Sequence, residues 1–204
     1  MYKLLDLYAR KYNVQYPVVC VDEKSKQLIE DVRKPIAMKP GSPEKYDGEY
    51  KRNGTQNIFV AVEPLAGKLY IKVTDQRKKT DFAKYVKELI SLYPNAKKIL
   101  LVTDNLNIHF SNSFYETFSE KEAESILNKI KFFYTPKHGS WLNMAEIEIN
   151  MMDKECLDRR IGQKEILKNE IAAWAKQRNK EKIKINWTFT KKKADEKLSK
   201  YYVA

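Results

Sequence analysis

The chain begins with apolar segments that predict strands and continues with segments of helical periodicity. Two apolar runs are continuous, 17–22 and 98–104, and each ends in an aspartate. Such runs are typical of strands that are buried on both faces of a mainly parallel sheet. Between them, segments 57–63 and 68–74 predict a hairpin, because apolar and polar residues alternate in the second segment.

Helical spacing of apolar residues predicts most of the remaining elements. A helix capped by Thr80 or Asp81 and stopped at Pro94 precedes the strand 98–104, and residues 105–112 read as loop. Ser119 and Glu122 are spaced as a capping box. The other predicted elements are an edge helix within 1–15, a helix from 119 to 130, a strand at 132–134, and helices from 141 or 142 to 156, from 164 to 179 and from about 194.

Residues 22–56 contain many charges, three prolines and few apolar side chains, which predicts mostly loop. A long loop in a compact domain is often functional. Its basic side chains either are solvated or follow a DNA backbone. These side chains are Lys24, Lys26, Arg33, Lys34, Lys39, Lys51 and Arg52.

The bulk composition supports one domain of ordinary size, with 204 residues of which 43% are apolar. The net charge of +12 favours a polyanionic partner, most commonly nucleic acid, although an anionic membrane surface remains an alternative. We expect a cytosolic protein, because no apolar run reaches the roughly 20 residues of a spanning helix and the first residues lack the features of a signal peptide. Cys20 and Cys156 are expected to be reduced core thiols.

The predicted helix 142–156 contains one acid of particular interest. At about 100° per residue, a polar stripe forms on this helix between two apolar surfaces, and it contains Asn143, Glu146, Asn150 and Asp153. Glu148 points to roughly the opposite side, so the two glutamates are expected to have different roles. Taken alone, Glu146 could equally be an ordinary solvated residue.

Two aspartates make a site at Glu146 more plausible. Asp22 and Asp104 each follow a buried strand, at the carboxyl edge where open α/β sheets bind their ligands. Three converging carboxylates repel one another unless a cation is bound. Their hard oxygen atoms suit Mg²⁺ or Mn²⁺, and two such ions can assist phosphodiester chemistry. The sequence therefore favours phosphoryl transfer on nucleic acid.

Four motifs, VCVDEKSKQL, NGTQNIFVAVEPLAGK, LVTDNLNIH and YTPKHGSWLNMAEIE, occur in this order along the chain. Together they resemble the catalytic domain of bacterial insertion-sequence transposases of family six-thirty, which are mariner-like members of the DDE transposase and retroviral integrase superfamily. The resemblance implies an α/β, RNase H-like mixed five-stranded sheet with flanking helices. It also implies that Asp22, Asp104 and Glu146 bind two divalent metal ions. Four further residues of the family pattern are site candidates, namely Glu23, Asn105, His109 and Asn143.

The two histidines, His109 and His138, lie in segments that should border this site. Either imidazole could contact phosphate or assist proton transfer, and structural hydrogen bonding is the alternative for both. Lys137, in the loop before Glu146, could bind phosphate. The candidates for DNA binding are therefore Lys24, Lys26, Arg52 and Lys137.

These inferences lead to the hypothesis of a single transposase catalytic domain over 1–204, with a basic extension from about 181 and no helix-turn-helix DNA-reading region before it. It would cleave DNA at the ends of a mobile element and transfer the freed 3′-hydroxyl to target DNA. The resemblance implies a TA-containing target and a homodimer or larger assembly on DNA. The alternatives are an RNase H-like nuclease that lacks strand transfer and a catalytically idle, transposase-derived DNA-binding or assembly protein.

Overall fold

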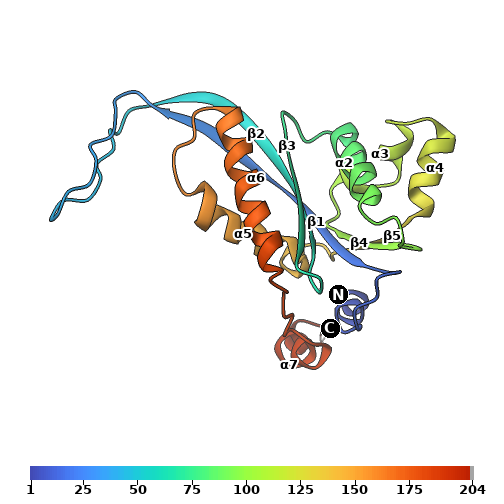
Figure 1. Ribbon diagram of the computed structural model, residues 1–204. Helices are drawn as coiled ribbons and strands as arrows, with labels where there is room; N and C mark the ends of the chain where they lie inside the picture. The colour runs from blue at the N-terminus through green and yellow to red at the C-terminus, as the bar shows by residue number, and fades with distance from the viewer. Residues whose placement is uncertain (203–204) are drawn as a thin grey trace.

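The computed structural model describes residues 1–202 and contains a five-stranded mixed sheet between two layers of helices (Figure 1). The strand order is β3-β2-β1-β4-β5. β1 pairs in parallel with β4, and β4 with β5, whereas β2 is antiparallel to both β1 and β3. The predicted α/β, RNase H-like sheet is confirmed. The strands are β1 (Val18–Asp31), β2 (Tyr50–Glu63), β3 (Lys68–Thr74), β4 (Ile99–Thr103) and β5 (Ile130–Tyr134).

Helices cover both faces of the sheet. In Figure 1, α2, α3 and α4 lie on one face and α5 and α6 on the other, while α1 and α7 contact each other near the chain ends. No helix within residues 1–202 combines the length and apolar character that crossing a membrane requires. The helices are α1 (Tyr2–Tyr8), α2 (Lys79–Ser91), α3 (Asn112–Tyr115), α4 (Glu120–Asn128), α5 (Ala145–Met152), α6 (Lys164–Glu181) and α7 (Lys191–Tyr202).

The continuous apolar run in β1 supplies both layers of the core. Val19 and Val21 pack toward α2 and α4, and Cys20 packs toward α1 and α5. Successive side chains of a strand point to opposite faces, so a strand that is buried on both faces cannot alternate in polarity. The prediction of a doubly buried first strand is confirmed.

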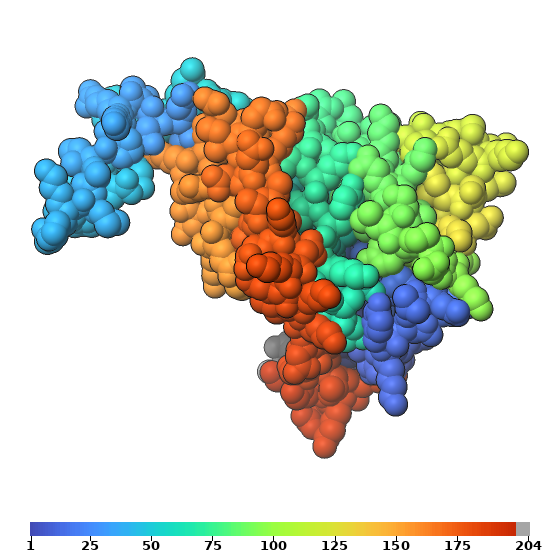
Figure 2. All heavy atoms as spheres, viewed as in Figure 1, coloured from blue at the N-terminus to red at the C-terminus, as the bar shows by residue number. Residues whose placement is uncertain are grey.

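The prediction of mostly loop over residues 22–56 is confirmed for 32–49, which contain neither helix nor strand, and is wrong for 22–31 and 50–56. β1 and β2 continue as a long antiparallel ribbon that pairs as far as Asp31 and Tyr50, and its tip stands clear of the body of the molecule (Figure 2). Few apolar side chains pack against this ribbon, so its polar side chains can face solvent. A distant segment supports it, because Ile29 N–H donates to the carbonyl of Ile161 at 2.9 Å and Asn53 Nδ2 to that of Gly162 at 2.9 Å.

Several predicted boundaries also need correction. The chain makes a 3₁₀ turn at Ser140–Leu142, and α5 begins only at Ala145 because Asn143 is extended. The same helical segment ends in a π-helix, Asp153–Leu157. α4 forms without a side-chain cap from Ser119 and ends at Asn128, because Ile130 already belongs to β5. Residues 105–115 contain the 3₁₀ turn Asn107–His109 and α3, and α7 begins at Lys191 rather than Ala194. The last two residues of the predicted basic extension, 203 and 204, lie outside the described residues.

Glu148 joins the two helices on one face of the sheet. Its side chain is 3% exposed, and the guanidinium of Arg178 on α6 donates to Oε1 at 2.7 Å and to Oε2 at 2.9 Å. Glu148 thus points away from the polar stripe of Glu146, as the helical spacing predicts. It stabilises the packing of α5 on α6, since a buried charge needs a hydrogen-bonded partner.

Replacing Arg178 should therefore destabilise the fold. We expect Arg178→Met to lower the free energy of unfolding by about 3–5 kcal/mol, because it leaves the carboxylate of Glu148 buried and uncompensated. Urea denaturation of the purified chain measures this change. The control is Lys176→Ala at an exposed position of the same helix, which should change stability by less than about 0.5 kcal/mol. Equal effects of the two substitutions would contradict the prediction.

Candidate active site

The parallel register of β1 and β4 brings the two predicted aspartates to one edge of the sheet. The last pair in this register is Cys20 with Val102, and Asp22 and Asp104 each stand two residues beyond it. Strands β1 and β4 are central, with β2 and β5 outside them. The two acids therefore lie side by side where the pairing of β1 with β4 ends. Asp104 follows β4 as predicted, whereas Asp22 lies within β1, which continues to Asp31 along β2.

Asp22 is buried, at 8% exposure, and lies on the sheet face that α5 covers. Its Oδ1 accepts the N–H of Glu23 at 2.8 Å, and its Oδ2 accepts Nδ2 of Asn143 at 3.2 Å. Burial, together with repulsion from Glu23, Glu146 and Asp104, raises the pKa of Asp22 to about 7. Glu146, half-buried on the first turn of α5, is thus close enough to act electrostatically on Asp22.

Asn143 fixes Asp22 relative to α5. Its Nδ2 also donates to the carbonyl of Val21 at 2.8 Å, while its Oδ1 accepts the N–H of Ala145 at 3.2 Å. The same amide therefore joins β1 to the beginning of α5. Asn143 precedes the helix instead of forming part of the predicted polar stripe, and this position lets both ends of its side chain reach backbone groups.

His109 lies between two acids on the opposite side of β1. It is fully buried, with Nε2 at 2.6 Å from Oε1 of Glu23 and Nδ1 at 2.6 Å from Oδ1 of Asp104. Its ring packs on Phe82 of α2, with 4.6 Å between the centroids. Burial alone would lower the pKa of His109, but hydrogen bonds and charge pairing with Asp104 and Glu23 raise it to about 10. The imidazolium donates from both nitrogens and so holds Asp104 in place.

Asp104 remains the more accessible of the two aspartates, with a side chain that is 22% exposed. Partial burial acts to raise its pKa, but hydrogen bonds from His109 and the N–H of Leu106, with the charges of His109 and Arg77, lower it overall. Arg77 lies in the exposed charged segment before α2. It was not among the predicted site residues, because nothing in the sequence pattern distinguishes it from neighbouring lysines.

The remaining candidates lie in different settings. Asn105 Nδ2 donates to the carbonyl of Thr135 at 2.5 Å, which ties the ends of β4 and β5 together. His138 is exposed and has a φ of 60°, and Lys137 beside it is also exposed. The structure therefore joins His109, but not His138, to the network of acids.

Three of the four basic candidates already have partners within the chain. Lys24 forms an ion pair with Asp153 at 2.5 Å. Lys26 donates to the carbonyls of Leu157 and Arg159 at 2.6 and 3.2 Å. Arg52 is exposed on the β1–β2 ribbon and donates to the hydroxyl of Tyr50 at 3.0 Å. Lys137 and Arg52 are thus more available to an outside ligand than Lys24 and Lys26 are.

The residue types at this site suit a divalent cation. Asp22, Asp104 and Glu146 provide hard carboxylate oxygens, and the raised pKa of Asp22 reflects burial first and then nearby negative charges that a cation would neutralise. Within residues 1–202, however, no three such side chains are gathered closely enough to hold an ion as they stand.

Comparisons with known proteins agree with this architecture. A family described as "DDE superfamily endonuclease" matches residues 17–168. No curated protein sequence matches the chain.

Similar solved structures include the Mos1 mariner paired-end complex with Mn, with 19% identity over 86% of this chain and a TM-score of 0.52. The Mos1 strand transfer complex shares 16% sequence identity over 89% of this chain, with a TM-score of 0.56. A pre-cleavage Mos1 transpososome shares 17% sequence identity, also over 89% of this chain, with a TM-score of 0.51. The matches cover 52%, 53% and 58% of the Mos1 chains, so this chain spans about half their length.

The raised pKa of Asp22 predicts a stabilising substitution. An acid whose folded-state pKa of about 7 exceeds its unfolded value of 3.8 destabilises the folded state progressively as pH rises between these values. We expect Asp22→Asn to stabilise the metal-free protein at pH 8 by a few kcal/mol, since one pKa unit corresponds to about 1.4 kcal/mol, and by less at pH 5. Urea denaturation with a chelator measures both values.

The control for this substitution is Glu124→Gln, at an exposed acid of α4. Its effect should be small and similar at both pH values. A destabilised Asp22→Asn protein at pH 8 would mean that contacts to the Asp22 carboxylate outweigh the charge repulsion.

The bridge through His109 predicts the opposite pH dependence. A histidine with a raised folded-state pKa contributes its full stability below the unfolded pKa of 6.5 and loses it as pH rises through about 10. We expect His109→Gln to destabilise the protein by roughly 3 kcal/mol or more at pH 6, since it breaks a buried charged network, and by less at pH 10. Denaturant midpoints between these pH values provide the measurement.

His138→Gln is the matched control, because this second histidine is exposed and lies outside the network. It should leave stability nearly unchanged across the same pH range. A difference between the native and His109→Gln proteins that stays constant with pH would show that packing, rather than charge, gives His109 its stabilising effect.

Proposed function

The chain belongs to the superfamily of DDE endonucleases, and from this premise we propose that it is the catalytic domain of a DNA transposase. It would cut DNA at the end of a mobile element and join the freed 3′-hydroxyl to target DNA. The observation that carries the proposal is the common position of Asp22 and Asp104 past their last strand pair, beside a third acid at Glu146. The net charge of +12 supports a polyanionic substrate.

In this proposal Asp22, Asp104 and Glu146 hold Mg²⁺ or Mn²⁺, in keeping with a solved Mos1 complex that contains Mn. Two ions would supply positive charge that helps a water attack the phosphodiester and stabilises the leaving oxygen. The protein side chains mainly position these groups, so no covalent protein intermediate is needed.

The surrounding side chains have supporting roles. Asn143 holds Asp22 against the beginning of α5, and His109 holds Asp104 through Nδ1. Arg77 acts electrostatically on Asp104 and is exposed, which places positive charge where a phosphate of the DNA would approach. His109 is buried between acids, so we assign it to positioning and not to contact with DNA.

The assembly is also part of the proposal. The Mos1 structures are a paired-end complex, a strand transfer complex and a transpososome. Because the fold is similar, we propose that this chain also assembles on DNA. A target that contains TA and a homodimer are expectations from the family resemblance.

The first test is Asp104→Asn in the full chain. We expect cleavage of DNA to fall by on the order of 10³-fold, because the loss of one carboxylate ligand removes several kcal/mol of transition-state stabilisation. Calorimetry with Mn²⁺, with short DNA absent and then present, should show weakened binding by the same variant. Glu124→Gln on α4 is the control and should leave both measurements unchanged.

The outcomes separate the alternatives. Cleavage and metal binding that both survive in Asp104→Asn would remove Asp104 from the ligand set. A native chain that binds no metal even on DNA would favour an idle DNA-binding or assembly protein. Cleavage without any joining of 3′ ends would favour a nuclease of the same fold.

A further inference from the structure

An exposed tryptophan lies next to the proposed active site. Trp141 belongs to the 3₁₀ turn Ser140–Leu142 and is 49% exposed. It precedes Asn143, whose amide contacts Asp22, by two residues, and consecutive Cα atoms are about 3.8 Å apart, so the two backbone positions lie within about 8 Å of each other. Tryptophan is highly buried on average and is enriched at interfaces, so an exposed ring at this position indicates a contact surface.

The residues around Trp141 are fixed by buried contacts, although its own ring is exposed. Leu142 and Asn143 are fully buried, and the carbonyl of Leu142 accepts the hydroxyl of Tyr8 on α1 at 2.8 Å. The ring of Trp141 contacts that of Phe189 in a T-shaped pair, with 5.1 Å between the centroids and 77° between the planes. Such a pair uses only the edge of one ring, so ring surface remains available to a flat ligand.

A cavity of about 270 Å³ continues this aromatic surface. Phe189 lines the cavity together with Trp187, between α1 and the segment that leads into α7. Trp187 is held in place, because its ring packs on Tyr8 at 5.2 Å between the centroids and its Nε1 donates to the carbonyl of Phe189 at 2.8 Å. The aromatic surface therefore runs from Trp141 over Phe189 to the cavity.

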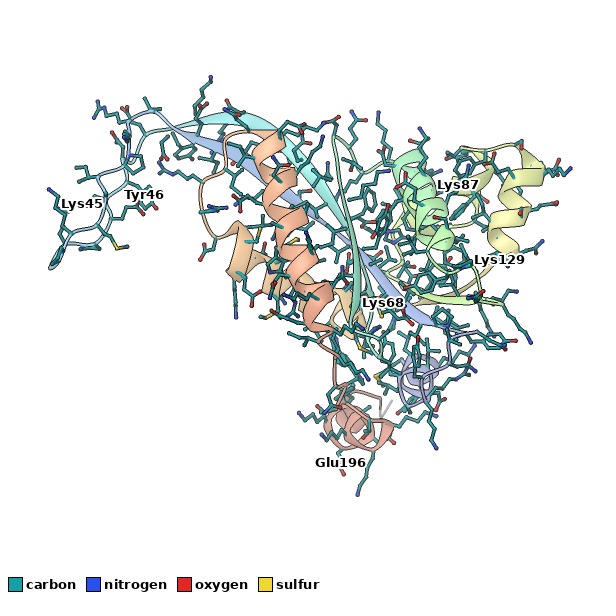
Figure 3. The ribbon with its side chains drawn as sticks, in the orientation of Figure 1. Lys45, Tyr46, Lys68, Lys87, Lys129 and Glu196 are labelled. Atoms are coloured by element: carbon teal, nitrogen blue, oxygen red, sulfur yellow. The ribbon has the colours of Figure 1, made fainter. Side chains whose placement is uncertain are left out.

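Positive charge surrounds this aromatic surface. Lys191 and Lys192 line the cavity, and Lys137 is exposed in the loop before the 3₁₀ turn. Asp6, an acid in the cavity wall, is paired with Lys191 at 2.6 Å. Glu196, labelled in Figure 3, points away from the rest of the molecule on the exposed side of α7. Aromatic rings beside cations suit a single strand of nucleic acid, because its bases stack on the rings and its phosphates bind the cations.

We propose that Trp141 and Phe189 form a stacking platform for unpaired bases of the DNA that is cut at the proposed active site. This role rests on the proposed transposase function, which supplies the DNA. The bases of an intact duplex stack on one another, so the platform selects nucleotides that are unpaired beside the point of cleavage. Lys137 and Lys192 provide contacts to the phosphates of the same strand.

The test measures the binding of labelled DNA to the full chain by fluorescence anisotropy, without metal ions so that no cleavage interferes. The probes are a short blunt duplex, the same duplex with a single-stranded thymidine tail, and the same duplex with a tail of abasic nucleotides. We expect the native chain to bind the thymidine-tailed duplex at least about fivefold tighter than the blunt duplex, because base stacking on an aromatic ring contributes at least this factor. The abasic tail keeps the phosphates without the bases, so it should lose this advantage.

Substitutions of Trp141 make the test specific. Trp141→Ala should weaken binding of the thymidine-tailed duplex at least about fivefold and leave binding of the other two probes nearly unchanged. Trp141→Phe, which keeps an aromatic face, should retain most of the preference for the tail. Tyr115→Ala is the matched control, because this exposed aromatic residue belongs to α3 on the opposite face of the sheet. Urea denaturation verifies that each variant is folded.

Three results would overturn the stacking platform. The first is a native chain that binds the thymidine-tailed and blunt duplexes equally. The second is an equal loss of affinity for all three probes in Trp141→Ala, since Trp141 would then act on DNA binding as a whole. The third is unchanged affinity in that variant, and a fall in its molar mass from dimer to monomer by light scattering would then assign the surface to a second copy of the chain.

The platform and the transposase activity can fail separately. If the native chain cleaves DNA with Mn²⁺ while Trp141→Ala binds the thymidine tail as the native chain does, the platform is refuted and the activity stands. If tail binding requires Trp141 but the native chain cleaves no DNA, the platform stands in a protein that binds DNA without cutting it.

Discussion

The site depends above all on the parallel pairing of β1 with β4. This register places Asp22 and Asp104 at equal distances past the pair of Cys20 and Val102, on strands whose apolar side chains are buried on both faces. Burial fixes the register, because a shift by one residue would turn the core side chains of a strand to the wrong face. The packing of the core thus positions the acids before any ligand is present.

Alternation along β1 assigns two neighbouring acids to different tasks. Asp22 points to the α5 side, where Asn143 contacts it and Glu146 repels it. Glu23 points to the α2 side and binds His109, which in turn binds Asp104. One face of the strand therefore carries Asp22, and the other face carries Glu23, which contacts Asp104 through His109. Both arrangements follow from a side-chain period of two.

The sequence predicted most of this fold and the proximity of Asp22 to Asp104, because long apolar patterns and the acids that follow them are local features. It did not predict the β1–β2 ribbon, whose stability depends on the distant residues 161 and 162. It also could not predict that His109 binds Glu23 and Asp104 at once, while His138 remains exposed. Contacts between residues far apart in the chain determine both the ribbon and the environment of each histidine. Such contacts cannot be inferred from the local sequence pattern.

Two glutamates of α5 show how their partners distinguish a structural acid from a proposed metal ligand. Glu148 is buried and bidentate to Arg178, so its charge is compensated within the chain. Glu146, on the same helix, is half-buried, and its negative charge acts on the buried carboxylate of Asp22. A folded chain retains such a cost where an outside cation offsets it. The same residue type therefore stabilises the fold at Glu148 and is a proposed metal ligand at Glu146.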